Sequence, residues 1–199
     1  MSTTIRGEAE IELFTDLYRM TVDEYERLVA AGALDDPKIE LLDGYLVRKM
    51  GKKPRHSTRS ERLRRLLERG LPLPGGWHVR QEQPVKIPEY NEPEPDLAIA
   101  RGEVEDYEDR HPDPGDVALI VEVADSSLAR DQGRKWVAYA RGGIPVYWIV
   151  NLVDHQVEVY SDPSPDGYLS SQALKPGQDV PVVIEGTLVG RIAVADVLP

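Results

Sequence analysis

The run from Val117 to Ala124 constrains the fold of this chain more than any other segment, because seven of its eight residues are apolar. Such a run is typical of a strand that lies in the middle of a sheet and is covered on both faces. It is far shorter than the roughly 20 apolar residues that a membrane-spanning helix needs. The sequence therefore predicts a central buried strand over residues 117–124.

Glu122 is the one residue that breaks this run. A carboxylate inside a central strand is costly unless it is paired with a cation or bound to a metal ion. We therefore take Glu122 as the first candidate functional residue. The alternative is that the strand alternates and that Glu122 faces solvent or pairs with an arginine.

Helices, strands and turns are predicted on both sides of this strand. A helix of about ten residues follows the capping-box sequence Thr21–Glu24, and further helices are predicted over 57–69 and 129–140. Strands are expected over 77–87, 97–100, 146–151 and 156–161, with a hairpin over 39–50 that turns at Asp43-Gly44. We expect a basic loop over 52–56, an acidic loop over 102–115 and C-terminal β-hairpins. This order predicts an α/β fold with one mixed sheet, in one domain over 20–199 after a tail or arm of residues 1–19.

Composition excludes several classes of protein. The 199 residues include no cysteine, so disulfides, thiolate zinc sites and thiol nucleophiles are excluded. The four histidines lack zinc-ligand spacing, and neither a P-loop nor a serine nucleophile elbow is present. The first 20 residues contain no apolar leader segment, so we expect a soluble, cytoplasmic protein.

The charge is unevenly distributed along the chain. The formal net charge is −11, yet residues 45–80 hold 11 basic and only two acidic side chains. Residues 82–125 hold 14 acids and three bases. A basic face beside an acidic centre is one interpretation; mutual neutralisation of the two segments, or a basic helix face that is simply solvated, are the others.

Asp96 is the second candidate, because it opens the short apolar strand expected over 97–100. Neighbouring strands that begin and end at the same edge would place Asp96 beside Glu122. Two adjacent carboxylates repel each other, and Mg²⁺, which prefers oxygen ligands, relieves that repulsion. The alternative for Asp96 is a turn-initiating residue after Pro95.

Lys135 and Glu40 complete the set of candidates. Lys135 lies on the helix that follows the Glu122 strand, where it either points over the end of the sheet or forms an i,i+4 surface pair with Asp131. Glu40 lies in an otherwise apolar stretch, and its alternative is an exposed strand position. His56 could contact phosphate or assist proton transfer, or it could be an ordinary loop histidine.

Several ordered motifs resemble the Uma-two family of restriction-endonuclease-like proteins, part of the PD-(D/E)xK nuclease superfamily. The motifs are Ile39–Gly44, His56, Pro95–Leu97, Val121–Ser127 and the block 134–150, and the resemblance covers roughly residues 20–198. It implies a restriction-endonuclease-like core with extra C-terminal β-hairpins. Each motif alone is weak, and their order and spacing carry the resemblance.

The resemblance also implies roles for individual residues. Asp96 and Glu122 match the two metal-binding acids. The backbone carbonyl of Val123 and Glu40, which matches the upstream acidic residue, are expected further ligands. The resemblance implies that the catalytic residues are Glu40, Asp96, Glu122 and Lys135. The lysine expected two residues after Glu122 is Ala124 here. The Uma-two branch takes its lysine from the following helix, which matches Lys135.

The implied function is a Mg²⁺-dependent endonuclease, with Mn²⁺ as a substitute ion and double-stranded DNA as the expected substrate. A homodimer would place two sites on the two strands. Phosphate contacts are expected from the basic segment, namely from Arg48, Lys52, Lys53, Arg55, His56 and Arg59.

Two alternatives remain open at this point. One is a catalytically idle interaction or oligomerisation domain that uses an aromatic edge of Tyr147, Trp148 and Tyr160. The other is a metal-dependent hydrolase of a different phosphoester.

Overall fold

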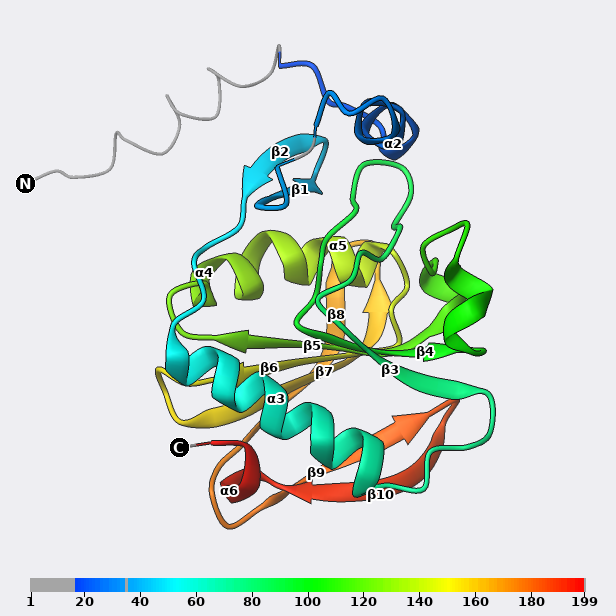
Figure 1. The fold of residues 1–199 in the computed structure, drawn as a ribbon. Coiled ribbons are helices and arrows are strands. Elements are labelled where there is room, and N and C mark those ends of the chain that lie inside the picture. Colours follow the sequence, from blue (N-terminus) through cyan, green and yellow to red (C-terminus); the bar gives the residue numbers. More distant parts are fainter. Residues whose placement is uncertain (1–16, 35, 199) are drawn as a thin grey trace, which may run out of the picture.

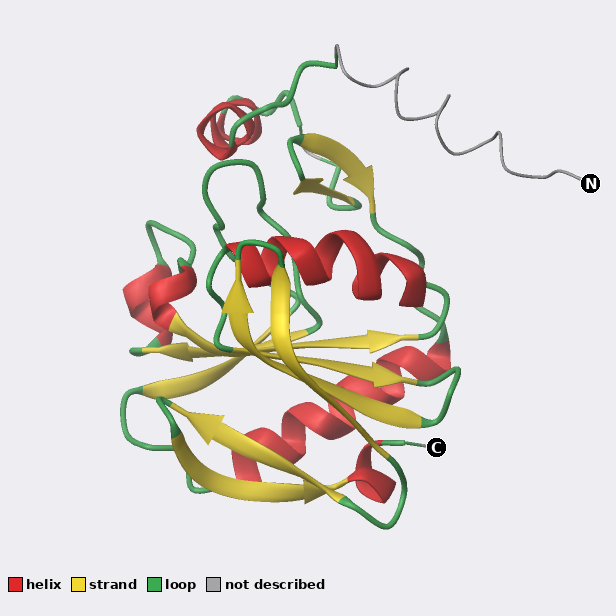
Figure 2. Ribbon diagram, turned by 180° about the vertical axis from the view of Figure 1, so that it is seen from behind, coloured by secondary structure: helices red, strands yellow, loops and turns green. Residues whose placement is uncertain are grey.

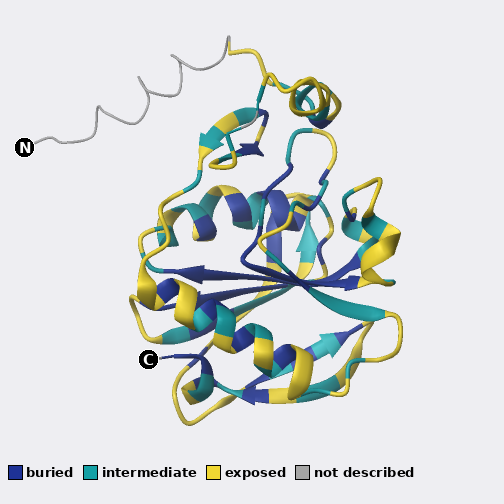
Figure 3. Cartoon of the chain, viewed as in Figure 1, coloured by how far each residue is buried: buried dark blue, intermediate teal, exposed yellow. Residues whose placement is uncertain are grey.

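The computed structural model of the protein describes residues 17–34 and 36–198. Their centre is a six-stranded mixed sheet of order β3-β4-β5-β6-β7-β8, in which only β5 and β6 run parallel (Figure 1). The strands are β3 (Trp77–Gln81), β4 (Leu97–Arg101), β5 (Val117–Ala124), β6 (Val146–Asn151), β7 (Gln156–Ser164) and β8 (Gly167–Leu174). Every residue of β5 is buried, which confirms the central strand predicted from the sequence (Figure 3).

Helices and a hairpin cover the two faces of this sheet. One face packs against α3 (Pro54–Arg69), the hairpin of β9 (Asp179–Ile184) and β10 (Thr187–Ala193), and α6 (Val194–Val197) (Figure 2). The other face packs against a helical segment made of α4 (Leu128–Arg130), a π-helical turn (Asp131–Lys135) and α5 (Trp136–Arg141). This helical segment is the crossover that parallel β5 and β6 require. The mixed α/β fold with added C-terminal hairpins is as predicted.

A small N-terminal unit lies above the α5 face of the sheet (Figure 1). It consists of α2 (Val22–Ala30) and the hairpin of β1 (Ile39–Leu42) and β2 (Tyr45–Arg48). Thr21 and Glu24 form the predicted capping box. Asp43 and Gly44 both adopt positive φ angles, 55° and 80°, as a two-residue hairpin turn of this type requires. The hairpin is therefore confirmed.

Two predicted boundaries are wrong, and one predicted loop contains short helical turns. Residues 52–56 are not all loop, because α3 begins at Pro54, a residue whose fixed φ suits the first turn of a helix. The strand predicted over 77–87 ends at Gln81, since Glu82 turns the chain with a φ of 52°. The acidic loop 102–115 contains two short 3₁₀ turns, Val104–Tyr107 and Pro114–Asp116.

The aromatic edge proposed for an interaction domain is not a surface. Tyr147 and Trp148 are 0% and 1% exposed, and Tyr160 is half-buried. The rings of Tyr147 and Tyr160 stack with centroids 5.9 Å apart, inside the core between the sheet and α5. These aromatic residues stabilise the core.

The division into a tail of residues 1–19 and a domain of residues 20–199 stays a prediction, because residues 1–16 lie outside the described part. No helix within residues 17–34 and 36–198 is long and apolar enough to cross a membrane.

Candidate active site

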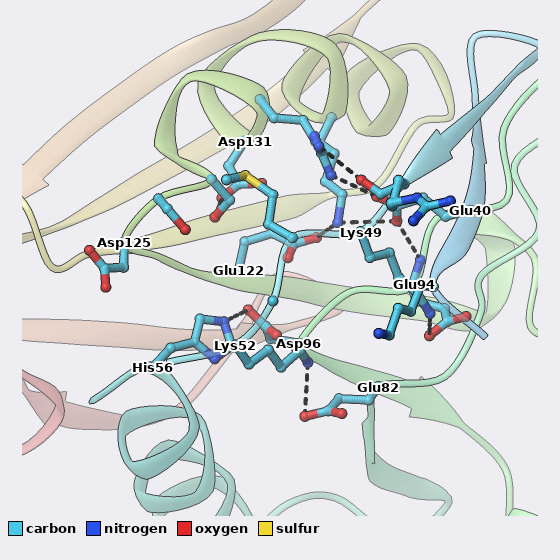
Figure 4. Close-up of a pocket in the computed structure, with 18 of the residues that line it drawn as sticks. Glu40, Lys49, Lys52, His56, Glu82, Glu94, Asp96, Glu122, Asp125 and Asp131 are labelled. Carbon is cyan, nitrogen blue, oxygen red and sulfur yellow. Dashed lines mark hydrogen bonds and ion pairs between the residues drawn. The ribbon is translucent and has the colours of Figure 1, made fainter. Parts of the chain in front are cut away.

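The sheet register brings the two predicted acids together. Strands β4 and β5 are antiparallel with Leu97 opposite Val121, so one further step of the register sets Asp96 opposite Glu122. Asp96 Oδ2 accepts a hydrogen bond from the Val123 amide at 2.8 Å, which ties the start of β4 to the end of β5. Both acids line one cavity, as Figure 4 shows.

Asp96 contacts the side chains of Lys52 and His56 besides the Val123 amide. Lys52 Nζ lies 3.0 Å from Oδ1, and His56 Nε2 lies 3.0 Å from Oδ2. Burial alone would raise the pKa of this carboxyl, but His56, Lys52 and the Val123 amide outweigh burial and lower the pKa of Asp96 to about 2. Asp96 is therefore ionised although it is only 5% exposed. The alternative of a turn-initiating residue after Pro95 does not account for these contacts, although the chain does bend at Asp96 before β4.

Glu122 is fixed through one of its two oxygens. Lys135 Nζ donates to Oε1 at 2.8 Å, and the Tyr139 hydroxyl donates to the same oxygen at 2.7 Å. No donor in the described part of the chain bonds to Oε2. Burial raises the pKa of the Glu122 carboxyl, Asp131 and Asp96 act in the same direction, and Lys135 opposes them. Glu122 is 4% exposed, so it does not face solvent.

Lys135 reaches Glu122 from the last residue of the π-helical turn. Such turns are rare and are frequent at functional sites. Lys135 is 6% exposed and its Nζ also lies 3.4 Å from Glu40 Oε2. Burial alone would lower the pKa of Lys135, but Glu122, Glu40 and Asp131 together hold it above the ordinary value. The predicted i,i+4 surface pair with Asp131 is wrong, because both side chains are buried.

Glu40 joins the site from β1 and is 1% exposed, so the alternative of an exposed strand position is wrong. Its Oε2 accepts a hydrogen bond from the Glu94 amide at 3.2 Å, and its Oε1 lies 3.5 Å from Arg130. Both oxygens of Glu40 thus have donors from the chain itself. The structure places Glu40 as a second partner of Lys135.

The cavity has a volume of about 490 Å³, with acids at its floor and cations around them. Lys49 pairs with Glu94 at 2.6 Å, Lys52 with Glu82 at 2.9 Å, and Lys53 with Asp125 at 3.2 Å. We define the cationic rim as the six bases at this cavity other than buried Lys135, namely Lys38, Arg48, Lys49, Lys52, Lys53 and Arg130. The exposed Arg48 forms no side-chain ion pair within the described residues.

The predicted basic segment therefore divides into two parts. Arg48, Lys52, Lys53 and His56 line the cavity, whereas Arg55 and Arg59 do not. Arg55 donates to the Leu152 carbonyl at 3.4 Å, and the buried Nε of Arg59 has no partner among the described residues. Farther along α3 the arginines are neutralised locally, by pairs such as Arg64–Glu61 at 2.8 Å, Arg65–Glu61 at 2.7 Å and Arg62–Asp196 at 3.0 Å. Ion pairs within the described residues thus involve three of the six arginines of α3, namely Arg62, Arg64 and Arg65.

Sequence reasoning missed three members of the site: Tyr139, Asp131 and Glu82. Asp131, Lys135 and Tyr139 are spaced by four residues and form one buried face of the helical segment. The segment predicted as a helix over 129–140 therefore buries polar side chains at its start. The i, i+4, i+8 spacing of three polar residues was the available signal.

The donors in the cavity fit Mg²⁺ in kind. Asp96 and Glu122 offer hard carboxylate oxygens, and Glu122 Oε2 is without a protein partner. No group of three acidic, histidine or cysteine side chains suited to a metal ion gathers within the described residues. A cation at this position would be held by two carboxylates and by water, which is a common arrangement for Mg²⁺. The Val123 carbonyl as a further ligand stays a prediction.

Comparison with known proteins identifies the family. Residues 22–192 match the family described as "Uma2: Putative restriction endonuclease". The fold is similar to that of a crystal structure described as a putative nuclease belonging to DUF820 from Anabaena variabilis ATCC 29413, with a TM-score of 0.65. The two chains are 15% identical, and the match covers 89% of this chain and 97% of the other. A search of curated proteins finds no match. The family match spans most of the chain, and the protein therefore belongs to the Uma2 family of putative restriction endonucleases.

Proposed function

We propose that the protein is a Mg²⁺-dependent endonuclease that hydrolyses phosphodiester bonds in double-stranded DNA. The observation that carries this proposal is the meeting of Asp96 and Glu122 in one cavity, with Lys135 buried against Glu122. Two carboxylates and an ammonium group are the side chains that metal-assisted phosphodiester hydrolysis needs. The family and the shared fold support the same reaction class.

Different residues of the cavity would have different roles in the reaction. A bound Mg²⁺ would neutralise charge on the scissile phosphate and lower the pKa of a water molecule. Asp96 and Glu122 would hold it, Asp96 as an acid that is ionised in advance. Lys135 carries three N–H donors, of which one donates to Glu122 Oε1 at 2.8 Å, and its ammonium group forms an ion pair with Glu40 Oε2 at 3.4 Å. A further N–H can orient the attacking water or a phosphate oxygen.

The cationic rim supplies the electrostatic path for the nucleic-acid backbone. Contacts of this kind position phosphates, carry no base information, and weaken steeply with salt. They also explain how a chain of net charge −11 could bind DNA, because the acids of the cavity are surrounded by bases. A homodimer, with one site for each DNA strand, stays a prediction.

The test is a calorimetric titration with Mn²⁺ beside a plasmid-cleavage assay in Mg²⁺. Wild-type protein is compared with the double variant Asp96→Asn plus Glu122→Gln. We expect the double variant to lose both metal binding and cleavage. Metal binding or cleavage that survives in the double variant would refute this site. Hydrolysis of nucleotides without cleavage of DNA would instead favour a hydrolase of another phosphoester.

Replacement of Lys52 separates metal binding from DNA binding. Its ammonium group lies 3.0 Å from Asp96 Oδ1, so a cation at Asp96 must compete with it. We expect Lys52→Met to raise Mn²⁺ affinity roughly threefold to tenfold and to weaken DNA binding, with a shallower salt dependence. Calorimetry and fluorescence anisotropy measure the two effects.

Lys53→Met is the matched control, since Lys53 pairs with Asp125 and its side chain is 60% exposed. It should weaken DNA binding without raising Mn²⁺ affinity. Equal Mn²⁺ affinities in wild type and Lys52→Met would show that Lys52 does not compete for Asp96.

A further inference from the structure

The geometry points to Tyr139 as a positioning residue, whose hydroxyl fixes Glu122 Oε1 and so turns Oε2 toward the cation. This inference rests on the function proposed above. Tyr139 lies on α5 and is 0% exposed, and its hydroxyl oxygen is 2.7 Å from Glu122 Oε1. Tyr139 does not itself line the cavity, but it bonds to Glu122, which does. Its effect must therefore pass through Glu122.

Lys135 cannot give Glu122 a single orientation by itself. Its ammonium group ends a flexible stem of four methylene groups and is shared between Glu122 Oε1, at 2.8 Å, and Glu40 Oε2, at 3.4 Å. An ammonium group attracts either carboxylate oxygen. The direction of the Glu122 carboxylate therefore needs a second and more rigid donor.

The Tyr139 hydroxyl is such a donor. Its ring packs against Tyr147 with centroids 4.9 Å apart, in the buried cluster between α5 and the sheet. A tyrosine phenol carries its proton at neutral pH, and this hydroxyl donates it to Glu122 Oε1. A rigid donor on Oε1 leaves Oε2 as the free oxygen, and no donor of the described residues bonds to it.

The π-helical turn and α5 place the Tyr139 hydroxyl and the Lys135 ammonium group on the same side of the helical segment. Lys135 ends the turn and Tyr139 lies four residues later, on the same face. The Tyr147 hydroxyl donates to the Asp131 carbonyl at 3.1 Å and so fixes the start of the turn. The two donors to Oε1 are thereby held on one rigid segment.

Tyr139→Phe is the test, because it removes only the hydroxyl. Groups that orient a metal ligand typically account for 10- to 100-fold in metal affinity. We expect calorimetry to show Mn²⁺ binding weakened at least tenfold in this variant. The matched control is Tyr168→Phe, which removes an equally buried hydroxyl whose acceptor, the Ile144 carbonyl at 3.0 Å, is outside the site. The control should stay within threefold of wild type.

The other outcomes separate this inference from the proposed function. Unchanged Mn²⁺ affinity in Tyr139→Phe, with binding lost in Glu122→Gln, would overturn the positioning role and leave the proposed function standing. Unfolding of Tyr139→Phe but not of Tyr168→Phe, seen by near-ultraviolet circular dichroism, would show that the hydroxyl is structural and would also overturn it. Binding that is absent in wild type, or that persists in Glu122→Gln plus Asp96→Asn, would overturn both.

Discussion

Lys135→Met is expected to destabilise the fold by about 3–5 kcal/mol at pH 7 and to lower turnover by roughly 100-fold or more. Lys135 is the shared partner of two carboxylates, Glu122 and Glu40, which are 4% and 1% exposed. Methionine keeps the volume of the stem but removes the one cation that faces both carboxyl groups, which leaves Glu122 without a cationic partner among the described residues and Glu40 with only Arg130. Turnover should fall further than Mn²⁺ affinity, because Asp96 and Glu122 remain.

Urea unfolding of Lys135→Met, repeated at pH 5 and pH 7, measures the stability effect. Stranded carboxylates are protonated more readily at pH 5, so the loss should be smaller there than at pH 7. Addition of Glu122→Gln to Lys135→Met should restore part of the stability, since it removes one stranded charge. Arg134→Met, on the exposed side of the same turn, should change stability by less than about 0.5 kcal/mol. A pH-independent loss for Lys135→Met would contradict the electrostatic explanation.

The sequence predicted the sheet and the two acids for a simple physical reason. An apolar run of this length is stable as a buried central strand, and its one carboxylate must then be paired inside the protein. The strand β5 is buried along its whole length, with Glu122 among its buried residues. Asp96 followed because the residues at adjoining ends of neighbouring strands lie opposite each other. The Asp43-Gly44 turn could also be predicted, because a two-residue hairpin turn needs positive φ angles and Asp and Gly adopt them readily.

The sequence could not predict how the helical segment after β5 meets the site. Apolar periodicity finds the face that packs on a core, but the first part of this segment buries Asp131 and Lys135 instead. Its π-helical turn has no signature in the hydrophobic pattern. Tyr139 was therefore missed, because a tyrosine amid apolar residues is typical of a core position, and Tyr139 does pack in the core while it bonds to Glu122.

The basic segment shows a second limit of sequence reasoning. Linear charge density does not say which bases find acidic partners after folding. On α3, Glu61 alone pairs with both Arg64 and Arg65. The bases of the cationic rim come mostly from the β1–β2 hairpin and the residues that follow it, and four of the six pair with acids there, namely Lys49, Lys52, Lys53 and Arg130.

Asp96→Asn is expected to abolish Mn²⁺ binding and to cost about 2–3 kcal/mol of stability at pH 7. The pKa of Asp96 is lowered from its ordinary value of 3.8 to about 2 in the folded protein. A carboxyl whose pKa is lowered by folding stabilises the protein above its unfolded pKa, here about pH 4, and this contribution is lost as the pH falls through about 2. The difference in unfolding free energy between wild type and Asp96→Asn should therefore be constant from pH 7 to pH 5 and shrink toward pH 3.

Urea unfolding across that pH range tests the cause as well as the size of the effect. Asparagine cannot accept from the Val123 amide, His56 and Lys52 at once, because one of its two terminal atoms is a donor. Asp125→Asn is the control, since Asp125 lines the same cavity but pairs only with the exposed Lys53, and it should cost less than about 1 kcal/mol. A difference for Asp96→Asn that stays constant down to pH 3 would mean that its charge does not stabilise the fold. Lys52, one of the contacts that keep Asp96 ionised, is also the group that a cation at Asp96 must displace, so the charge measured by this titration is the charge that Asp96 offers to a metal ion.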